Sequence, residues 1–177
     1  MWLNKPCKKV RDSNSSFTLL GLLVVISLVL TISALILPRY KRGEQLFAIQ
    51  RSSYKLAEDI GRAREMAISV REFKGEIPKG GWGVYLTKGA STYILFADLA
   101  NFGAYDVGEE LSEISLEAGV GIKELSPASP LTIVFKGPDP VVTINQDENI
   151  TTALITLSIS SFEKTISVNK AGLIEIE

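Results

Sequence analysis

The sequence predicts an α+β fold, in which a long, partly transmembrane N-terminal helix packs on an antiparallel β-sheet or small β-sandwich. Apolar residues recur with helical spacing from residue 46 to residue 70, after an uncharged apolar run. Beyond residue 80, short β-rich segments alternate with turn residues. The expected segments are a leader over 1–16, a transmembrane helix over 17–38, an amphipathic helix over 39–71 and a β domain over 72–177.

Composition excludes several kinds of functional site. The chain has 177 residues, a formal net charge of −1, no histidine and a single cysteine, Cys7. A disulfide within the chain is therefore excluded, and so are zinc sites built on Cys and His. Triads and dyads that depend on His or Cys are excluded as well. We expect a non-enzymatic protein without a resident cofactor.

The first predicted element is an uncharged run of 21 residues, from Phe17 to Leu37. A basic stretch precedes it, as in a secretory signal peptide, with Lys5, Lys8, Lys9 and Arg11. The run is too long for the apolar region of such a signal, and no small-x-small cleavage site follows it. About 20 apolar residues match the hydrocarbon thickness of a membrane, so we expect a retained helix. Basic residues lie on both sides of the run, so charge alone does not fix its orientation.

The second predicted element is an amphipathic helix from Leu46 to Val70. Its apolar stripe recurs at three, four or seven residues, through Leu46, Ile49, Leu56, Ile60, Ala63 and Ala67. The opposite face is charged, with Arg51, Lys55, Glu58, Arg62 and Glu65. Pro38 removes a backbone hydrogen bond and predicts a kink, and Gly43 is a second weak point. The stripe needs a protein surface, which the β domain would provide.

The β domain is predicted to hold about eight strands, mostly antiparallel because their connections are short. A glycine-rich loop over 73–83 leads into them. The predicted strands cover 82–87, 92–98, 111–119, 131–136, 141–145, 151–160, 164–170 and 173–177. Turn residues at 88–91 and at Ala171-Gly172 predict two hairpins.

The segment "SFTLLGLLVVISLVLTISALILPRY" (16–40), with its basic leader, resembles the signal of type IV prepilins and type II secretion pseudopilins. The residues that match the family's first mature positions and its later Pro and Tyr are Phe17, Thr18, Leu19, Leu20, Pro38 and Tyr40. The resemblance implies that a prepilin peptidase cuts between Ser16 and Phe17 and methylates the new terminus. The apolar segment is then a membrane anchor first and a filament core later. Assembly is expected to involve Phe17, Thr18, Leu19, Leu20, Gly21, Leu22, Pro38 and Tyr40.

The expected partners and location follow from the same resemblance. They are other pilin or pseudopilin subunits, the prepilin peptidase, an inner-membrane assembly platform and membrane lipid. The chain would pass once through the cytoplasmic membrane with its β domain outside the cytoplasm, and would join a periplasmic or surface filament. The segments "LAEDIGRAREMAI" (56–68) and "KTISVNKAGLIEIE" (164–177) resemble the H-type pseudopilins and FimT-like minor pilins in particular.

Two residues depart from the family pattern. Ser16 stands where Gly usually precedes the cut, and Gly21 stands where the fifth mature residue is usually Glu. That Glu is thought to neutralise the amino terminus of a neighbouring subunit, and pairing is what makes a charge tolerable in lipid. A subunit with Gly21 cannot offer this contact, although it can receive one. Location at a filament tip and simple drift both explain the glycine.

A calcium loop is a further hypothesis. "DLANFGAYDVGE" (98–109) has Asp98, Gly103, Asp106 and Glu109 at positions 1, 6, 9 and 12 of a twelve-residue loop. Ala100 and Phe102 occupy positions 3 and 5, which should carry oxygen ligands. A polar hairpin loop without a metal is the competing interpretation, and it is favoured.

DNA binding and ligand binding at a membrane are two alternatives to a filament subunit. Arg62, Arg64 and Lys55 could contact DNA, but acidic residues outnumber basic ones after residue 16 and no basic stripe with interleaved aromatic residues is present. Nucleic acid is therefore an unlikely partner. The main alternative is a membrane-anchored extracytoplasmic module that binds calcium or a surface ligand and does not assemble.

Overall fold

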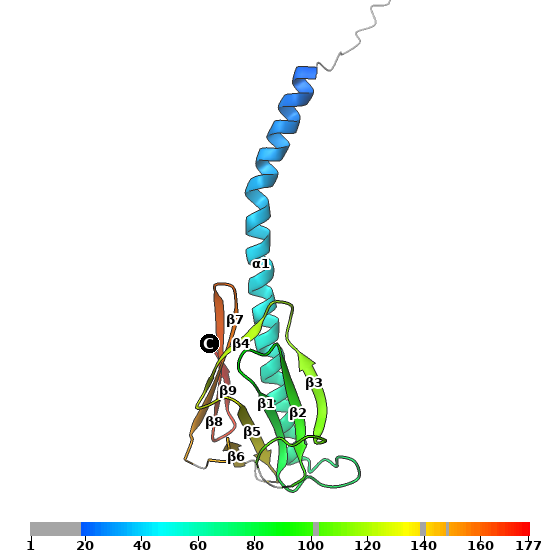
Figure 1. Cartoon of the computed structure of the whole chain (residues 1–177), viewed down its shortest axis with the longest axis vertical. Coiled ribbons are helices and arrows are strands. Elements are labelled where there is room, and N and C mark those ends of the chain that lie inside the picture. The colour runs from blue at the N-terminus through cyan, green and yellow to red at the C-terminus, as the bar shows by residue number, and fades with distance from the viewer. Residues whose placement is uncertain (1–18, 101–102, 139–140, 148) are drawn as a thin grey trace, which may run out of the picture. The chain divides into compact units, whose positions relative to one another are not determined.

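Figure 1 shows the computed structural model of the chain, which describes residues 19–100, 103–138, 141–147 and 149–177, with only the backbone for 35–39. Over this described part, one helix, α1 (Leu19–Ile68), is followed by nine strands. The chain divides into two compact units between Lys41 and Arg42. The helix assignment continues through Pro38 and Gly43, and the kink at Pro38 stays a prediction.

The strands form two antiparallel sheets. Their bounds are β1 (Gly81–Leu86), β2 (Thr92–Asp98), β3 (Glu110–Ser115), β4 (Gly121–Ser126), β5 (Leu131–Lys136), β6 (Val141–Ile144), β7 (Thr152–Ile159), β8 (Phe162–Asn169) and β9 (Ile174–Ile176). The five-stranded sheet has the order β3-β2-β1-β5-β6, and the four-stranded sheet has the order β4-β7-β8-β9. Every pairing within these sheets is antiparallel, as the short connections predicted.

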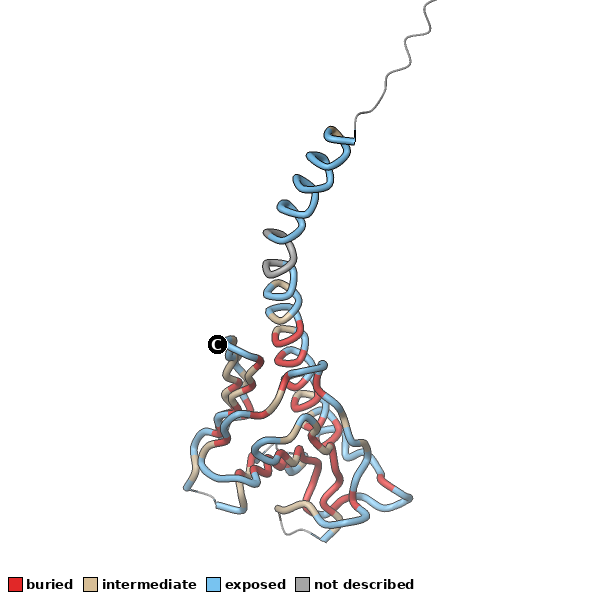
Figure 2. The backbone as a smooth tube through the Cα atoms, turned by 45° about the horizontal axis from the view of Figure 1, so that its top comes forward, coloured by how far each residue is buried: buried red, intermediate tan, exposed pale blue. Residues whose placement is uncertain are grey.

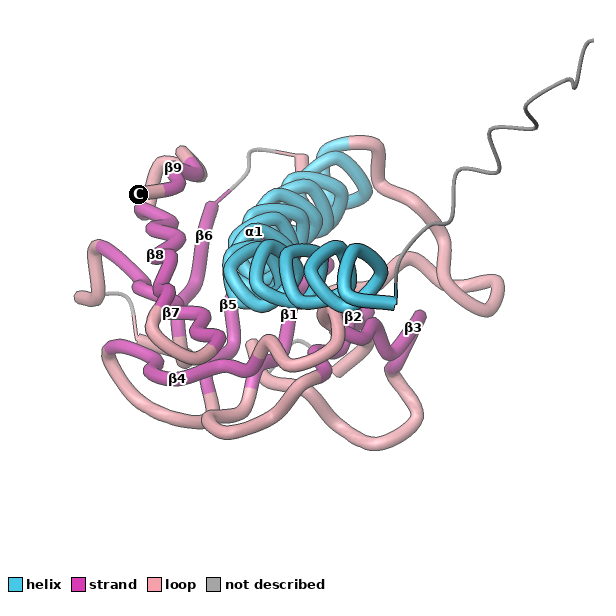
Figure 3. Tube along the Cα trace, turned by 90° about the horizontal axis from the view of Figure 1, so that it is seen from above, coloured by secondary structure: helices cyan, strands magenta, loops and turns pink. Residues whose placement is uncertain are grey.

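The C-terminal half of α1 shares one hydrophobic core with both sheets. Five residues of the predicted stripe are almost fully buried, namely Ile49, Leu56, Ile60, Ala63 and Ala67. They join core side chains from the strands, such as Val84, Ile133 and Ile155. Figure 2 shows the buried positions gathered in this part of the helix and in the strands, and Figure 3 shows the strands arranged around α1. The predicted α+β class is therefore confirmed.

Two details of the prediction are wrong. Leu46 was placed on the buried stripe, but 40% of its surface is exposed, so the core contact of α1 begins one turn later, at Ala48 and Ile49. The strand β4 was not predicted. A register shift between Ile122 and Glu124 interrupts its alternation, so its buried residues Ile122 and Leu125 are three positions apart instead of two.

The predicted hairpins are confirmed. β1 pairs with β2 across residues 87–91, and β8 pairs with β9 across the turn at Ala171-Gly172. Gly172 has a φ of +77°, which favours glycine, and its N–H donates to the Asn169 carbonyl at 2.9 Å. The Asn169 side chain also accepts the N–H groups of Ala171 and Leu173. This turn is therefore closed by its own backbone and by one asparagine.

Two polar residues on the buried side of α1 have hydrogen-bond partners in the β domain. Asp59 is only 9% exposed and accepts a 2.6 Å hydrogen bond from the hydroxyl of Tyr93, which is 1% exposed. Ser52 is fully buried, and its Oγ accepts the N–H of Glu117 at 3.0 Å. A buried polar group without a partner is costly, so these pairs stabilise the packing of α1 on β2 and on the connection between β3 and β4.

Candidate functional site

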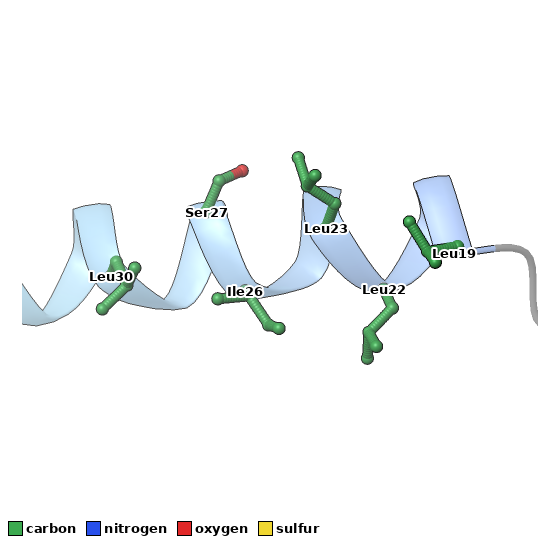
Figure 4. A pocket seen from close by; sticks show the side chains of 6 residues that line it. All are labelled: Leu19, Leu22, Leu23, Ile26, Ser27 and Leu30. Atoms are coloured by element: carbon green, nitrogen blue, oxygen red, sulfur yellow. The ribbon is translucent and has the colours of Figure 1, made fainter.

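The N-terminal half of α1 is apolar on all sides. Between Leu19 and Ile32, exposures range from 48% at Ile32 to 80% at Leu19 for the large apolar side chains that the structure describes as exposed. Figure 4 shows side chains of this segment pointing in different directions from the helix. Six of them border an open groove of about 420 Å³, namely Leu19, Leu22, Leu23, Ile26, Ser27 and Leu30. We call residues 19–34 the apolar segment.

Two hydroxyl groups of the apolar segment donate hydrogen bonds to its own backbone. Ser27 Oγ donates to the Val24 carbonyl at 2.9 Å, and Thr31 Oγ1 donates to the Ser27 carbonyl at 2.7 Å. This back-bonding is how a helix satisfies short hydroxyl side chains without water. The segment therefore presents a continuous apolar surface although its sequence contains polar residues.

The transmembrane prediction is only partly covered by the described residues. Where the structure describes the chain, no helix is both long and apolar enough to cross a membrane. Phe17, Thr18 and the side chains of 35–38 belong to the predicted span and lie outside the described residues.

The predicted processing and assembly residues fall into two groups. Ser16, Phe17 and Thr18, and the side chain of Pro38, lie outside the described residues. Leu19, Leu20, Gly21 and Leu22 form the first turn of α1, and Tyr40 is 73% exposed further along it. The described assembly residues thus lie on one helix, and their large apolar side chains are open to solvent.

Two of the three predicted calcium-loop carboxylates, those of Asp98 and Glu109, accept backbone N–H groups. Asp98 Oδ2 accepts the N–H of Gly103 at 2.6 Å, and its side chain lies against Gly80. Glu109 is 6% exposed, and its two oxygens accept the N–H groups of Leu99 at 2.8 Å and Asp106 at 3.2 Å. These oxygens of Asp98 and Glu109 are therefore already engaged by N–H groups of the chain.

The spatial arrangement gives the calcium hypothesis little support. In the described ranges, no three His, Cys, Asp or Glu side chains are grouped closely enough to hold a metal ion. Calcium binding by Asp98, Asp106 and Glu109 stays a prediction. Thermal melting in millimolar calcium tests it, because a cation bound only to the folded state raises the melting temperature.

A second feature lies on the outer face of the five-stranded sheet, and the sequence patterns did not point to it. Trp82, Val84 and Leu86 of β1 belong to the core shared with α1. Since side chains alternate along a strand, Tyr85 points to the opposite face. Phe96 of β2 lies there too, with its ring over Gly83, where a Cβ atom would meet the ring at 2.9 Å.

Tyr105 joins these two aromatic rings from the loop that follows β2. Its ring centroid lies 5.0 Å from that of Tyr85 and 5.5 Å from that of Phe96, both ordinary aromatic contacts. Burial and the neighbouring Glu110 carboxylate raise the pKa of the Tyr105 phenol. The N–H groups of Glu110 and Gly108 lower the pKa of the Glu110 carboxyl, so this charge stays beside the Tyr105 hydroxyl at neutral pH.

A pocket of about 350 Å³ opens beside the two tyrosines. Its side-chain lining includes Tyr85, Tyr105, Pro130, Thr132, Asn145 and Gln146. We call it the outer-face pocket. The sequence patterns could not predict this pocket, because its residues come from four separate segments of the chain. The one usable signal is the turn-forming Asn145, which was instead assigned to the end of a strand.

Two of the three cations that could contact DNA make hydrogen bonds to the β domain. Arg64 Nη1 donates to the Gly172 carbonyl at 3.3 Å, and the Arg64 side chain lies against Gly172 in the C-terminal turn. Lys55 Nζ donates to the Ser115 carbonyl at 3.3 Å, whereas Arg62 is exposed. Two of the three cations therefore tie α1 to the β domain.

Comparisons with known proteins do not assign the chain to a family. No protein-family model matches it, and neither curated proteins nor solved structures give a match. The resemblance to prepilins and pseudopilins consequently stays an expectation from the residues at 16–40 and at the two later segments.

Proposed function

We propose that this chain is a minor pilin or pseudopilin, a non-enzymatic structural subunit of a type IV pilus or type II secretion pseudopilus. A prepilin peptidase would remove residues 1–16 and leave Phe17 as the first residue. The subunit would stay in the cytoplasmic membrane through its apolar helix, with the β domain outside the cytoplasm. An assembly platform in that membrane would then add it to the filament.

The observation that carries this proposal is the exposure of the apolar segment. Its leucines, isoleucines and valines are at least 48% exposed, and the hydroxyls of Ser27 and Thr31 bond to its own backbone. Removing a large apolar side chain from water contributes about 1.5–3 kcal/mol, so such a surface requires a cover. Lipid would cover it before assembly, and the helices of neighbouring subunits would cover it afterwards.

The β domain supports the proposal in a different way. It covers one stripe of α1 with its own core and leaves the charged face of the helix, including Arg51, Glu58 and Arg62, at the surface. In the described residues, the core of the β domain therefore covers this stripe without a partner chain. The subunit's assembly contacts are then free to lie mainly in the apolar segment.

Intact-mass spectrometry of the protein purified from membranes tests the proposal. We expect a mature chain that begins at Phe17, with a mass increase of one methyl group at the terminus. Ser16→Arg should block processing, because a long charged side chain replaces a small one at the cut. Ser13→Arg is the matched control and should be processed normally. An assembled or functional protein that retains residues 1–16 would contradict the proposal and favour the non-assembling module.

The glycine at position 21 gives a second test of assembly. If the subunit occupies a filament tip because it lacks a carboxylate there, Gly21→Glu should change the amount incorporated or its position. Crosslinking of subunits in isolated filaments measures both quantities. Unchanged incorporation and position in Gly21→Glu would show that the glycine has no role in placement.

A further inference from the structure

We propose that the outer-face pocket binds a neutral saccharide. This inference goes beyond the role in filament assembly, because it concerns a sheet face that α1 does not cover. A volume of about 350 Å³ lies within the range of about 300–1,000 Å³ that small-molecule sites occupy. The chemistry of its walls selects the class of ligand.

One wall of the pocket is aromatic. The rings of Tyr85 and Tyr105 are inclined by 39° with centroids 5.0 Å apart, and Tyr105 also meets the Phe96 ring at 70°. Each tyrosine combines an apolar ring with a polar hydroxyl. A sugar ring presents C–H groups on its faces and hydroxyl groups at its edge, so it matches both parts of such a wall.

The other wall is polar and uncharged. Thr132, Asn145 and Gln146 supply a hydroxyl and two amides, each of which can both donate and accept hydrogen bonds. Among the lining residues that the structure describes, none is charged. An ionic ligand would therefore meet no opposite charge in this lining, whereas the hydroxyl groups of a neutral saccharide would find donors and acceptors.

The amide of Asn145 is held in a fixed orientation. Its Oδ1 accepts the N–H of Thr132 at 2.7 Å, and the Asn145 N–H donates to the Thr132 carbonyl at 2.9 Å. With Oδ1 fixed in this way, the Nδ2 group is a preset donor. A donor that is already oriented costs less entropy when a ligand binds.

The turn that carries Gln146 has a backbone conformation that is unfavourable for glutamine. Asn145 and Gln146 have φ values of +48° and +62°, and the Asp147 N–H donates to the Ile144 carbonyl at 3.0 Å. Positive φ at both central positions is typical of a type I′ hairpin turn, which favours Asn followed by Gly. Gln in the second position costs free energy, and strain of this kind is concentrated at functional sites.

Hydrogen bonds hold the described residues on both sides of Tyr105. On one side, the Gly103 N–H donates to Asp98 Oδ2, and Gly103 lies against Gln146 and Thr143. On the other side, the N–H groups of Asp106 and Gly108 donate to the carboxylates of Glu109 and Glu110, respectively. The carboxylates at the calcium-like positions Asp98 and Glu109 thus help to place a tyrosine.

Saturation-transfer NMR on the full chain tests the inference. The protein is held in a zwitterionic detergent, since a glycoside detergent would itself compete as a sugar. The probes are maltose, cellobiose and N,N′-diacetylchitobiose. We expect saturation transfer to at least one of them, and at least about tenfold weaker binding in Tyr105→Ala, which removes the ring from the aromatic wall.

Gln146→Gly separates loss of binding from loss of folding. Glycine suits the second position of a type I′ turn, so this variant should fold at least as well as the original chain while binding the saccharide several-fold more weakly. Tyr54→Ala on the exposed side of α1 is the matched control and should bind normally. Absence of transfer to all three disaccharides would overturn the inference, as would binding that Tyr105→Ala and Gln146→Gly leave unchanged.

Discussion

Two regions of the same helix, residues 19–34 and residues 48–67, differ in how their apolar side chains are covered. In the first region, Leu19 and Leu23 are 80% and 61% exposed. In the second region, Ile49 and Leu56 are fully buried beneath two sheets. The second region has a charged face to turn to water, whereas the apolar segment has none. In the proposed function, lipid and other subunits cover this helix, because it has no polar face to turn to water.

The two regions should differ most in how much their apolar side chains contribute to the free energy of unfolding. Leu56→Ala should lower the free energy of unfolding of the β domain by about 2–5 kcal/mol, because it leaves a cavity in a fully buried site. Leu23→Ala, the same change in the apolar segment, should leave it unaltered. Urea unfolding followed by Trp82 fluorescence, in a Trp2→Phe background, measures both. Equal losses in the two variants would show that the regions are not independent.

A charge introduced into the apolar segment tests whether lipid covers this segment. Ile26→Arg should disfavour membrane insertion by about 2.5–3.5 kcal/mol, the cost of an arginine at the centre of a membrane helix. Detergent phase partitioning should accordingly move this variant toward the aqueous phase. Arg51→Leu, on the charged face of the second region, should not alter partitioning. If Ile26→Arg partitions like the original chain, lipid is not what covers the segment.

The helical structure of α1 and most of its buried stripe could be predicted because both depend on local sequence pattern, whereas the membrane span stays a prediction. The spacing of Ile49, Leu56 and Ile60 is visible without any knowledge of the sheets, and so is the lack of charge before Pro38. Leu46 fits the same spacing but lies one turn before the first core contact, a limit that depends on where the sheets end. The strand β4 was missed because its register shift hides the alternation.

The candidate sites show the same division between local and tertiary information. The loop over 98–109 was recognised from its acidic spacing, but where Asp98 and Glu109 direct their oxygens depends on the N–H groups of Gly103, Leu99 and Asp106. The outer-face pocket could not be predicted, since Tyr85, Tyr105 and Asn145 become neighbours only when the sheet forms. The processing residues Ser16 and Phe17 rest on the sequence resemblance alone.

The buried pair of Asp59 and Tyr93 predicts an effect of intermediate size on the free energy of unfolding of the second region. Burial raises the pKa of the Tyr93 phenol, and the hydrogen bond to Asp59 raises it further. Tyr93→Phe leaves the Asp59 carboxylate without this donor and should cost about 1–3 kcal/mol at pH 7. Tyr54→Phe, on the exposed side of the helix, should cost nothing measurable. Urea unfolding of both variants checks the difference.

The Asp59–Tyr93 pair also predicts that the free energy of unfolding falls as the pH rises above the unfolded-state pKa of tyrosine. Since the pKa of Tyr93 is raised in the folded state, its contribution to stability is complete below the unfolded-state pKa near 10 and is lost as the pH rises above it. The expected slope is about 1.4 kcal/mol per pH unit, because only the unfolded chain ionises there. Unfolding titrations from pH 9 to pH 11 should show this extra loss in the original chain and not in Tyr93→Phe. Parallel curves would mean that Tyr93 ionises while folded.

The smallest expected difference is between two serines of α1. Ser52 is buried in the second region and accepts the N–H of Glu117, while Ser27 in the apolar segment bonds only to its own helix. Ser52→Ala leaves the Glu117 N–H without this acceptor and should cost about 1 kcal/mol. Ser27→Ala removes a bond to a carbonyl that the helix already uses, and alanine is the better helix former by a few tenths of a kcal/mol.

Urea unfolding with Trp82 as reporter should therefore separate Ser52→Ala from Ser27→Ala, although both remove one hydroxyl from one helix. Arg51 also contacts Glu117 at 3.4 Å, but this ion pair is exposed and contributes at most about 1 kcal/mol, so it cannot replace Ser52. Arg51→Ala serves as the control for that contact. If Ser52→Ala and Ser27→Ala unfold at the same urea concentration, water reaches the Glu117 N–H. In that case the Ser52 hydroxyl does not contribute to joining α1 to the segment after β3.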